Sequence, residues 1–122
     1  MDVEVQAATC PIYMTLAAIG GRWKPLIIYR LFEGTKRFSE LKRGIVGVTQ
    51  KMLTQQLREL ERSGLVTRRV YPQVPPRVEY SLTVTGESLR GVMQAMSAWG
   101  ERYRLVNGCR VVKKRSSLAR EP

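Results

Sequence analysis

The sequence predicts a mainly helical fold that carries one small β-hairpin. Residues 49–64 place their leucines three and four positions apart, as an amphipathic helix does. Directly afterwards the apolar residues alternate in two runs, 66–71 and 77–82, around a proline-rich tip at residues 72–76, which is typical of a hairpin. A hairpin that follows the second helix of a helix-turn-helix is a wing. The predicted fold class is therefore a winged helix-turn-helix.

Residues that start and end helices divide the first part of the chain into two helices. Pro11 opens the first, and the Gly20-Gly21 pair should end it, because glycine adopts the left-handed conformation found at helix ends. Pro25 suits the first turn of the second helix, where its missing N–H is not needed. Apolar residues on nearly every side of this second helix, which runs toward Gly34, predict that it is central and buried.

A short strand and two further helices follow. Residues 36–38 are predicted to form an edge strand, and Ser39 to cap a brief helix over residues 39–45. A glycine-bearing turn leads to Thr49, which we expect to cap the helix that ends at Gly64. Two helices joined by so short a turn have the outline of a helix-turn-helix.

After the hairpin, the sequence predicts one long helix and a basic tail. Apolar residues recur at helical spacing from Thr85 onward, over about four to five turns. We therefore divide the chain into an N-terminal arm (residues 1–9), a winged helix-turn-helix domain (10–106) and a basic tail (107–122) that we expect to be partly disordered.

The composition limits the partners and activities of the chain. Its 122 residues suffice for one domain, and its 21 Lys and Arg outnumber its 10 Asp and Glu to give a formal net charge of +11. This charge favours a polyanion, with nucleic acid ahead of an anionic membrane surface. Histidine is absent, which excludes His-based catalytic triads, general bases and metal ligands. We expect no enzymatic activity, no cofactor and no metal site.

The sequence also predicts a cytoplasmic protein. No run approaches the roughly 18 to 20 consecutive apolar residues that a membrane span requires, so no membrane is expected as a partner. The N-terminus carries two acids and lacks the apolar stretch of a secretory signal. Two cysteines, Cys10 and Cys109, are too few for a disulfide scaffold.

One face of the helix over residues 49–63 gathers amides, hydroxyls and cations, while its acids, Glu59 and Glu61, lie late in the helix and off this face. Arg and Lys donate hydrogen bonds to guanine, Gln pairs with adenine, and Thr offers a hydroxyl and a methyl group. We therefore select a set of candidate DNA contacts from this helix: Thr49, Gln50, Lys51, Thr54, Gln55 and Arg58. The alternative is a solvated face that merely lacks acids.

The distribution of charge favours DNA contact. From Lys36 to Arg77 there are ten cations and three acids, so the positive excess concentrates around the predicted helix-turn-helix and wing. Lys36, Lys42, Arg69 and Arg77 are further candidate DNA contacts, although Arg77 could instead only cap the hairpin. Arg68 and Arg69 point to opposite faces of a strand, so at most one of them should contact the duplex.

Four segments of the chain form a specific pattern: GRWK at residues 21–24, KMLT at 51–54, LREL at 57–60 and the wing segment 71–80. With these segments, about residues 10–103 strongly resemble the HxlR family of bacterial winged helix-turn-helix transcriptional regulators, relatives of the MarR type. This resemblance implies a homodimer that represses transcription by binding a pseudo-palindromic operator in double-stranded DNA. The helix over residues 49–63 would enter the major groove and the wing, residues 71–77, would reach the minor groove.

Dimerisation in this family uses the terminal helices, which agrees with an apolar stripe near the C-terminus. The stripe consists of Leu89, Met93, Met96, Trp99 and Tyr103. It is wider than one small core needs, so we assign it to a dimer interface. The alternative is packing on the first and second helices of the same chain, which should take up part of the stripe.

Several family members sense oxidants or electrophiles through a cysteine just before the first helix, where Cys10 stands here. The positive end of a helix dipole stabilises a thiolate and so favours its reaction. The resemblance thus implies a small oxidant or electrophile as inducer, whereas the alternative is that Cys10 is only a small buried apolar residue.

Two competing functions are a winged-helix module that binds proteins without reading DNA, and a small cationic nuclease, which the missing histidine disfavours.

Overall fold

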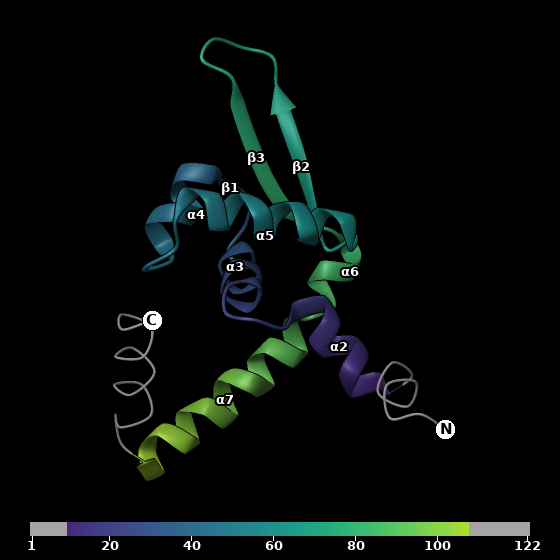
Figure 1. The fold of residues 1–122 in the computed structure, drawn as a ribbon, viewed down its shortest axis with the longest axis vertical. Coiled ribbons are helices and arrows are strands. Elements are labelled where there is room, and N and C mark those ends of the chain that lie inside the picture. The colour runs from purple at the N-terminus through teal and green to yellow at the C-terminus, as the bar shows by residue number, and fades with distance from the viewer. Residues whose placement is uncertain (1–9, 108–122) are drawn as a thin grey trace. The chain divides into compact units, whose positions relative to one another are not determined.

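The structure, a computed structural model, describes residues 10–107 (Figure 1). The chain divides into two compact units between Arg90 and Gly91. The predicted N-terminal arm, residues 1–9, and all of the predicted tail after Asn107 lie outside the described residues, as does Cys109.

The described residues form a mainly helical chain with one small antiparallel sheet, which confirms the predicted fold class. The elements, in chain order, are α2 (Pro11–Ile19), α3 (Lys24–Leu31), β1 (Lys36–Arg37), α4 (Phe38–Gly44), α5 (Gln50–Arg62), β2 (Val66–Tyr71), β3 (Arg77–Leu82), α6 (Val84–Glu87) and α7 (Arg90–Asn107).

The sheet has the strand order β1-β3-β2. In the hairpin, β2 and β3 pair antiparallel from Val66 opposite Leu82 to Tyr71 opposite Arg77, so both predicted runs are confirmed with their bounds. The edge strand β1 adds to the other side of β3, with Lys36 opposite Tyr80. Chain segments on both sides of the helix-turn-helix thus meet in one sheet, which fixes the base of the wing.

The helix that carries the candidate DNA contacts begins as predicted. The Thr49 hydroxyl oxygen accepts a hydrogen bond of 3.1 Å from the backbone N–H of Met52, which satisfies one of the free donors of the first turn. After α5, Gly64 has a φ of 77°, the left-handed conformation that glycine adopts at lowest cost.

The predicted cap at Ser39 is wrong. Helix α4 already begins at Phe38, and Arg37 occupies the N-cap position. The carboxylate of Glu40 accepts a hydrogen bond of 2.7 Å from the backbone N–H of Arg37, so a side chain inside the first turn satisfies the start of the helix. Because strand β1 runs directly into the helix, no separate residue is left to act as a hydroxyl cap.

The predicted single C-terminal helix is also wrong, because the chain forms a short α6 and then α7. The Thr83 hydroxyl accepts from the N–H of Gly86 at 3.0 Å and donates to the Gly64 carbonyl at 2.6 Å, so it ties the start of α6 to the end of the helix-turn-helix. A Cβ atom on Gly86 would lie 2.1 Å from the carbonyl oxygen of Leu65. Gly86 therefore packs closely on Leu65, and α6 is a separate short helix that ends at Glu87.

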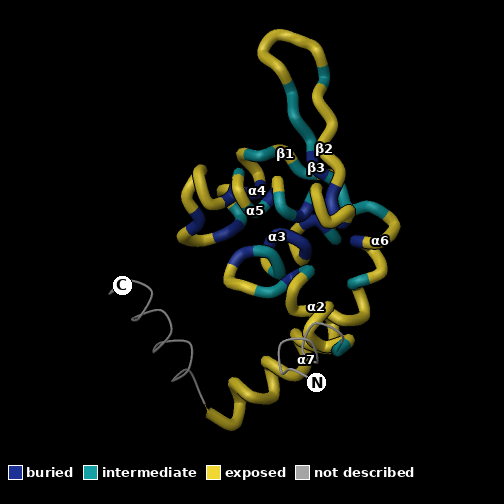
Figure 2. Tube along the Cα trace, turned by 45° about the vertical axis from the view of Figure 1, so that its right-hand side comes forward, coloured by how far each residue is buried: buried dark blue, intermediate teal, exposed yellow. Residues whose placement is uncertain are grey.

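The core of the first unit lies between α3, α5 and the base of the sheet, where Figure 2 shows dark blue stretches of chain. Its fully buried side chains are those of Ile27, Ile28, Leu41, Leu53, Leu57 and Leu60. Helix α3 ends at Leu31, earlier than predicted, and exposes about half of Leu26 and Tyr29, so it buries one face rather than all sides.

Candidate nucleic-acid interface

Helix α5 has two chemically distinct faces. Leu53, Leu57 and Leu60 are buried in the core, whereas Gln50, Lys51, Gln55 and Arg58 are exposed. The leucines fix the orientation of the helix, so the polar side chains face outward, where another molecule can reach them. Gln55 also hydrogen-bonds the carboxylate of Glu59, one turn later in the helix.

Thr54 is the partly buried member of the predicted set. Its hydroxyl donates a hydrogen bond of 2.8 Å to the backbone carbonyl of Gln50, one turn earlier. The hydroxyl proton is therefore used within the helix, while the methyl group and the oxygen lone pairs remain for other contacts.

One acid of α5, Glu59, forms an ion pair with the first residue of α3. The ammonium of Lys24 lies 2.6 Å from a carboxylate oxygen of Glu59, with side chains 14% and 31% exposed. The hydrogen bond and the positive charge of Lys24 lower the pKa of Glu59 below its ordinary value. This pair ties the start of α3, within the GRWK segment, to the C-terminal half of α5. Sequence reasoning gave Lys24 no role beyond that resemblance.

A groove of about 440 Å³ runs between α5 and the sheet. It is lined by Phe38, Gln50, Thr54, Leu57, Arg58, Glu61, Arg68, Val78 and Tyr80. It brings together three of the predicted contacts, Gln50, Thr54 and Arg58. It also contains Glu61, which the sequence placed off the polar face.

Arg68 is the groove residue that sequence reasoning missed. Strand alternation allowed one of Arg68 and Arg69 to contact DNA, and the sequence-based choice was Arg69. The register places Arg68 opposite Tyr80, on the side of the sheet that carries the buried Val66. The sequence did contain a signal for this choice. Val66 and Arg68 are two positions apart and so lie on the same side of the strand, and an apolar residue such as Val66 is expected on the side that faces the helices.

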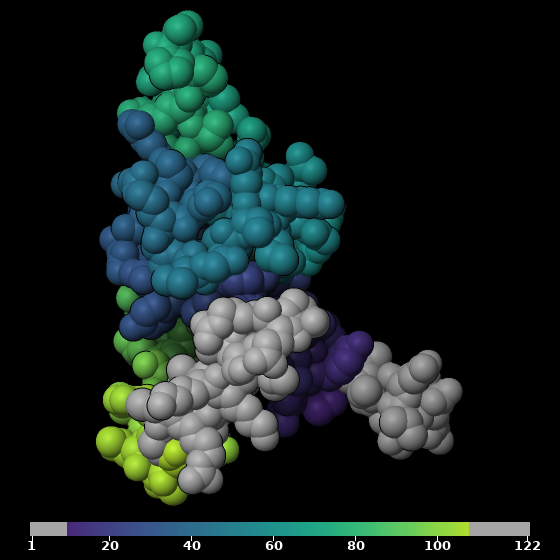
Figure 3. Space-filling view, turned by 60° about the vertical axis from the view of Figure 1, so that its left-hand side comes forward, coloured from purple at the N-terminus to yellow at the C-terminus, as the bar shows by residue number. Residues whose placement is uncertain are grey.

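On the other face of the wing, Arg69 and Arg77 both lie close to one aromatic ring. Their guanidinium carbons lie 5.2 Å and 4.2 Å from the centre of the Tyr71 ring. The Nε of Arg77 lies 3.4 Å from a carboxylate oxygen of Glu79. Figure 3 shows the hairpin, in green, projecting beyond the blue surface of α4 and α5.

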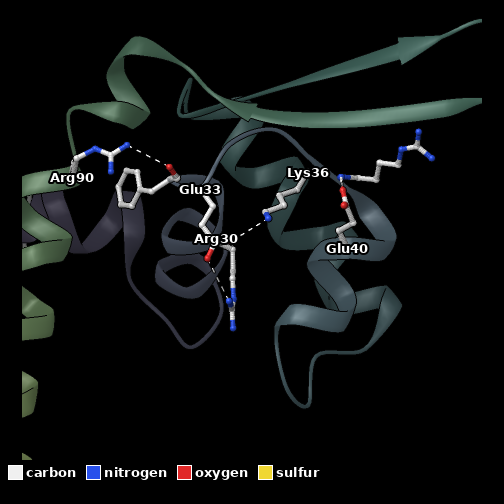
Figure 4. Close-up of polar contacts among 7 residues, drawn as sticks. Arg30, Glu33, Lys36, Glu40 and Arg90 are labelled. Atoms are coloured by element: carbon white, nitrogen blue, oxygen red, sulfur yellow. Dashed lines mark hydrogen bonds and ion pairs between the residues drawn. The ribbon is translucent and has the colours of Figure 1, made fainter.

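The two predicted lysine contacts differ in their surroundings. The ammonium of Lys36 lies 3.0 Å from a carboxylate oxygen of Glu33, and this contact lowers the pKa of Glu33 (Figure 4). Lys36 does not line the groove. Lys42 is exposed on α4 and forms no ion pair with any residue from 10 to 107, so its charge faces solvent.

Cys10 lies at the N-cap position of α2, as the sequence predicted, and its thiol is free and partly exposed. The amides of the first helical turn follow it directly, with Pro11 at the first position of the helix.

Helix α7, in the second unit, carries large apolar side chains that its own unit leaves uncovered. Met96, Trp99 and Tyr103 are 49%, 58% and 41% exposed, and the two aromatic rings stack with centres 5.0 Å apart. Of the other two residues in the predicted stripe, Met93 is buried and Leu89 is partly buried.

The family description "HxlR-like helix-turn-helix" matches residues 18–107, which is well over half of the chain. The chain belongs to the HxlR family. It is therefore a transcriptional regulator with a helix-turn-helix domain, as the sequence predicted. The part of the chain that the structure describes holds no helix both long and apolar enough to cross a membrane.

The chain is also similar to curated transcriptional regulators and to solved structures. YkvN of Bacillus subtilis, described as an uncharacterized HTH-type transcriptional regulator, is 56% identical over 95 residues, which are 78% of this chain and 80% of YkvN. The redox regulator HypR in its reduced form is 50% identical, with a TM-score of 0.77 over 80% of this chain and 96% of HypR. Its oxidised form is 52% identical, with a TM-score of 0.73 over 76% and 96% of the two chains.

Proposed function

We propose that this HxlR-family chain is a homodimeric repressor that binds a pseudo-palindromic operator in double-stranded DNA. Helix α5 enters the major groove and the wing over residues 71–77 reaches the neighbouring minor groove. The observation that carries the proposal is the exposed polar face of α5 above a leucine face that is fully buried.

The proposed contacts divide by the chemistry that they offer. Gln50, Lys51, Gln55 and Arg58 present amide and cationic donors along the exposed face of α5, where base edges can be read. The remaining proposed contacts, which act mainly on the DNA backbone or at the edges of the site, are Lys36, Lys42, Thr49, Thr54 and Arg77.

A second copy of the chain binds the second half-site of the operator. The exposed stack of Trp99 and Tyr103, together with Met96, offers an apolar surface that a partner helix would remove from water. Dimers of helix-turn-helix proteins place two reading helices one turn of DNA apart, which gives the operator its dyad symmetry.

Cys10 is the proposed sensor. Its thiol is partly exposed at the start of α2, where a small molecule can reach it from solvent. In the proposed step the thiol proton passes to solvent and the sulfur adds to a carbon of an electron-poor alkene. The carbon–carbon π bond breaks, and the carbanion that results takes a proton from solvent. The structural likeness to the redox regulator HypR supports this role.

The test compares binding of the purified protein to a duplex from upstream of its own or a neighbouring gene with binding to random duplex of equal length. We expect preference for the upstream duplex, and a loss of about three to five decades in affinity between 50 and 200 mM salt if six to ten phosphates are contacted. Gln55→Ala should reduce the preference, whereas Lys42→Ala should weaken both duplexes alike. Equal affinity of the wild-type protein for both duplexes would contradict the proposed sequence-specific binding. A protein that ignores DNA and co-purifies with another protein would favour the interaction module instead.

A further inference from the structure

We propose that Arg68 on β2 binds a DNA phosphate in the groove between α5 and the sheet. On this account Arg68, rather than Arg69, is the cation of this strand that contacts the duplex. The inference rests on the proposed function, because it adds a residue to the same DNA-binding surface.

The register of the hairpin fixes the side of the sheet on which Arg68 lies. It stands opposite Tyr80, and directly paired residues in an antiparallel ladder share a face. Tyr80 is 7% exposed and Val66, two positions before Arg68, is 2% exposed, so this face packs toward the helices. Arg68 itself is exposed, and it lines the groove at the place where the strand leaves the core.

The charges in the groove suit a phosphate. Arg58 lines the α5 side and Arg68 the strand side, and neither forms an ion pair with any residue in the described range 10–107. Glu61 is the acid among the lining residues, so two guanidinium groups accompany one carboxylate. The planar guanidinium donates two parallel hydrogen bonds that match the geometry of phosphate oxygens.

The apolar lining strengthens this contact. Leu57, Val78 and Tyr80 line the groove beside the charged groups and leave less room for water. A charge pair at such a boundary interacts more strongly than one surrounded by bulk water. The groove lies between the helix proposed for the major groove and the wing proposed for the minor groove. The DNA backbone must pass between those two contacts.

Arg69 has a different set of partners. Its guanidinium lies over the ring of Tyr71, and the guanidinium of Arg77 lies over the same ring. Arg77 in turn forms an ion pair with Glu79. Cross-strand pairing places Arg69 itself opposite Glu79. Its guanidinium therefore lies beside an aromatic ring on the side of the sheet away from the groove.

The experiment measures the affinity of the full chain for the upstream duplex and for random duplex, by fluorescence anisotropy, between 50 and 200 mM salt. Arg68→Ala should lower the affinity for both duplexes by about tenfold or more, because a phosphate contact carries no sequence information. The slope of log affinity against log salt should become shallower by about 1.8 per dimer, which is two contacts at about 0.9 each. Arg69→Ala removes the same charge from the opposite face and should cause smaller changes in both quantities.

Arg68→Lys separates charge from geometry. It keeps the positive charge but not the planar fork, so it should retain the wild-type salt slope and recover only part of the affinity. Thermal unfolding of each variant checks that the fold is kept, and Arg68→Lys still tests the proposal if Arg68→Ala is unstable. The inference is wrong if Arg69→Ala loses as much affinity as Arg68→Ala, or if Arg68→Ala keeps the wild-type salt slope. Failure of the proposed operator binding appears separately, as a wild-type protein that does not prefer the upstream duplex.

Discussion

At the scale of single residues, the Lys24–Glu59 ion pair positions α5 for its proposed role. Its nitrogen and oxygen are 2.6 Å apart, and Lys24 is only 14% exposed, so loss of Glu59 leaves a mostly buried ammonium without its partner. The same contact predicts how stability changes with pH. Lys24 lowers the pKa of Glu59 in the folded chain below its ordinary value of 4.5, so protonation favours the unfolded chain.

The stabilisation from this pair should be complete above about pH 4.5 and should disappear as the pH falls through the folded pKa of Glu59. Glu59→Gln should therefore lower the thermal midpoint at pH 7 and flatten its decline between about pH 6 and pH 3. Lys24→Met provides the control, since adding Glu59→Gln to it should change the pH dependence little. The interpretation would be wrong if Glu59→Gln changed the pH dependence of the thermal midpoint equally in the wild-type chain and in Lys24→Met.

Cys10 gives a second prediction at the residue scale. Because its thiol lies at the start of α2, Cys10→Ser should abolish the effect of a thiol oxidant or electrophile on DNA affinity, while DNA binding before treatment stays intact. Anisotropy before and after treatment measures this. Cys109→Ser is the matched control and should respond as the wild-type protein does. An undiminished response in Cys10→Ser would exclude the proposed sensor.

At the scale of the element, α5 should separate stability from DNA binding. Leu53 is completely buried, so Leu53→Ala should lower the free energy of unfolding by about 2 to 5 kcal/mol. Lys51 is exposed on the other face, so Lys51→Ala should change that free energy by less than about 0.5 kcal/mol and still weaken DNA binding. Urea unfolding and anisotropy measure the two effects. A large loss of stability in Lys51→Ala would show that the polar face is structural.

Elements governed by local chemistry were predictable from the sequence. Thr49 caps α5, and both hairpin strands have the predicted bounds, because a cap and an alternating period act within a few residues. The cap at Ser39 and the continuous last helix were wrong because contacts from Glu40 and from Thr83 with Gly64 decide those boundaries. Alternation likewise separated Arg68 from Arg69, but only packing against the helices determines which side of the strand faces the groove.

For the whole molecule, the proposed binding to a symmetric operator requires two copies of the chain. Trp99→Glu places a charge in the exposed aromatic stack of α7 and should convert a dimer into a monomer of 13.9 kDa. Gln94→Glu adds the same charge on the opposite side of α7 and should leave the mass unchanged. Light scattering after size-exclusion chromatography measures both. A wild-type monomer, or a Trp99→Glu dimer, would contradict the assigned interface.

We propose that the acid-poor exposed face of α5 reads base edges and that a second copy of the chain repeats this contact across a twofold axis. Selection of bound duplexes from a random pool tests both parts of this proposal together. We expect an enriched site with dyad symmetry and half-sites about 10 base pairs apart, and loss of base preference within each half-site for Gln55→Ala. A pool without enrichment, or a single site without symmetry, would contradict this proposal.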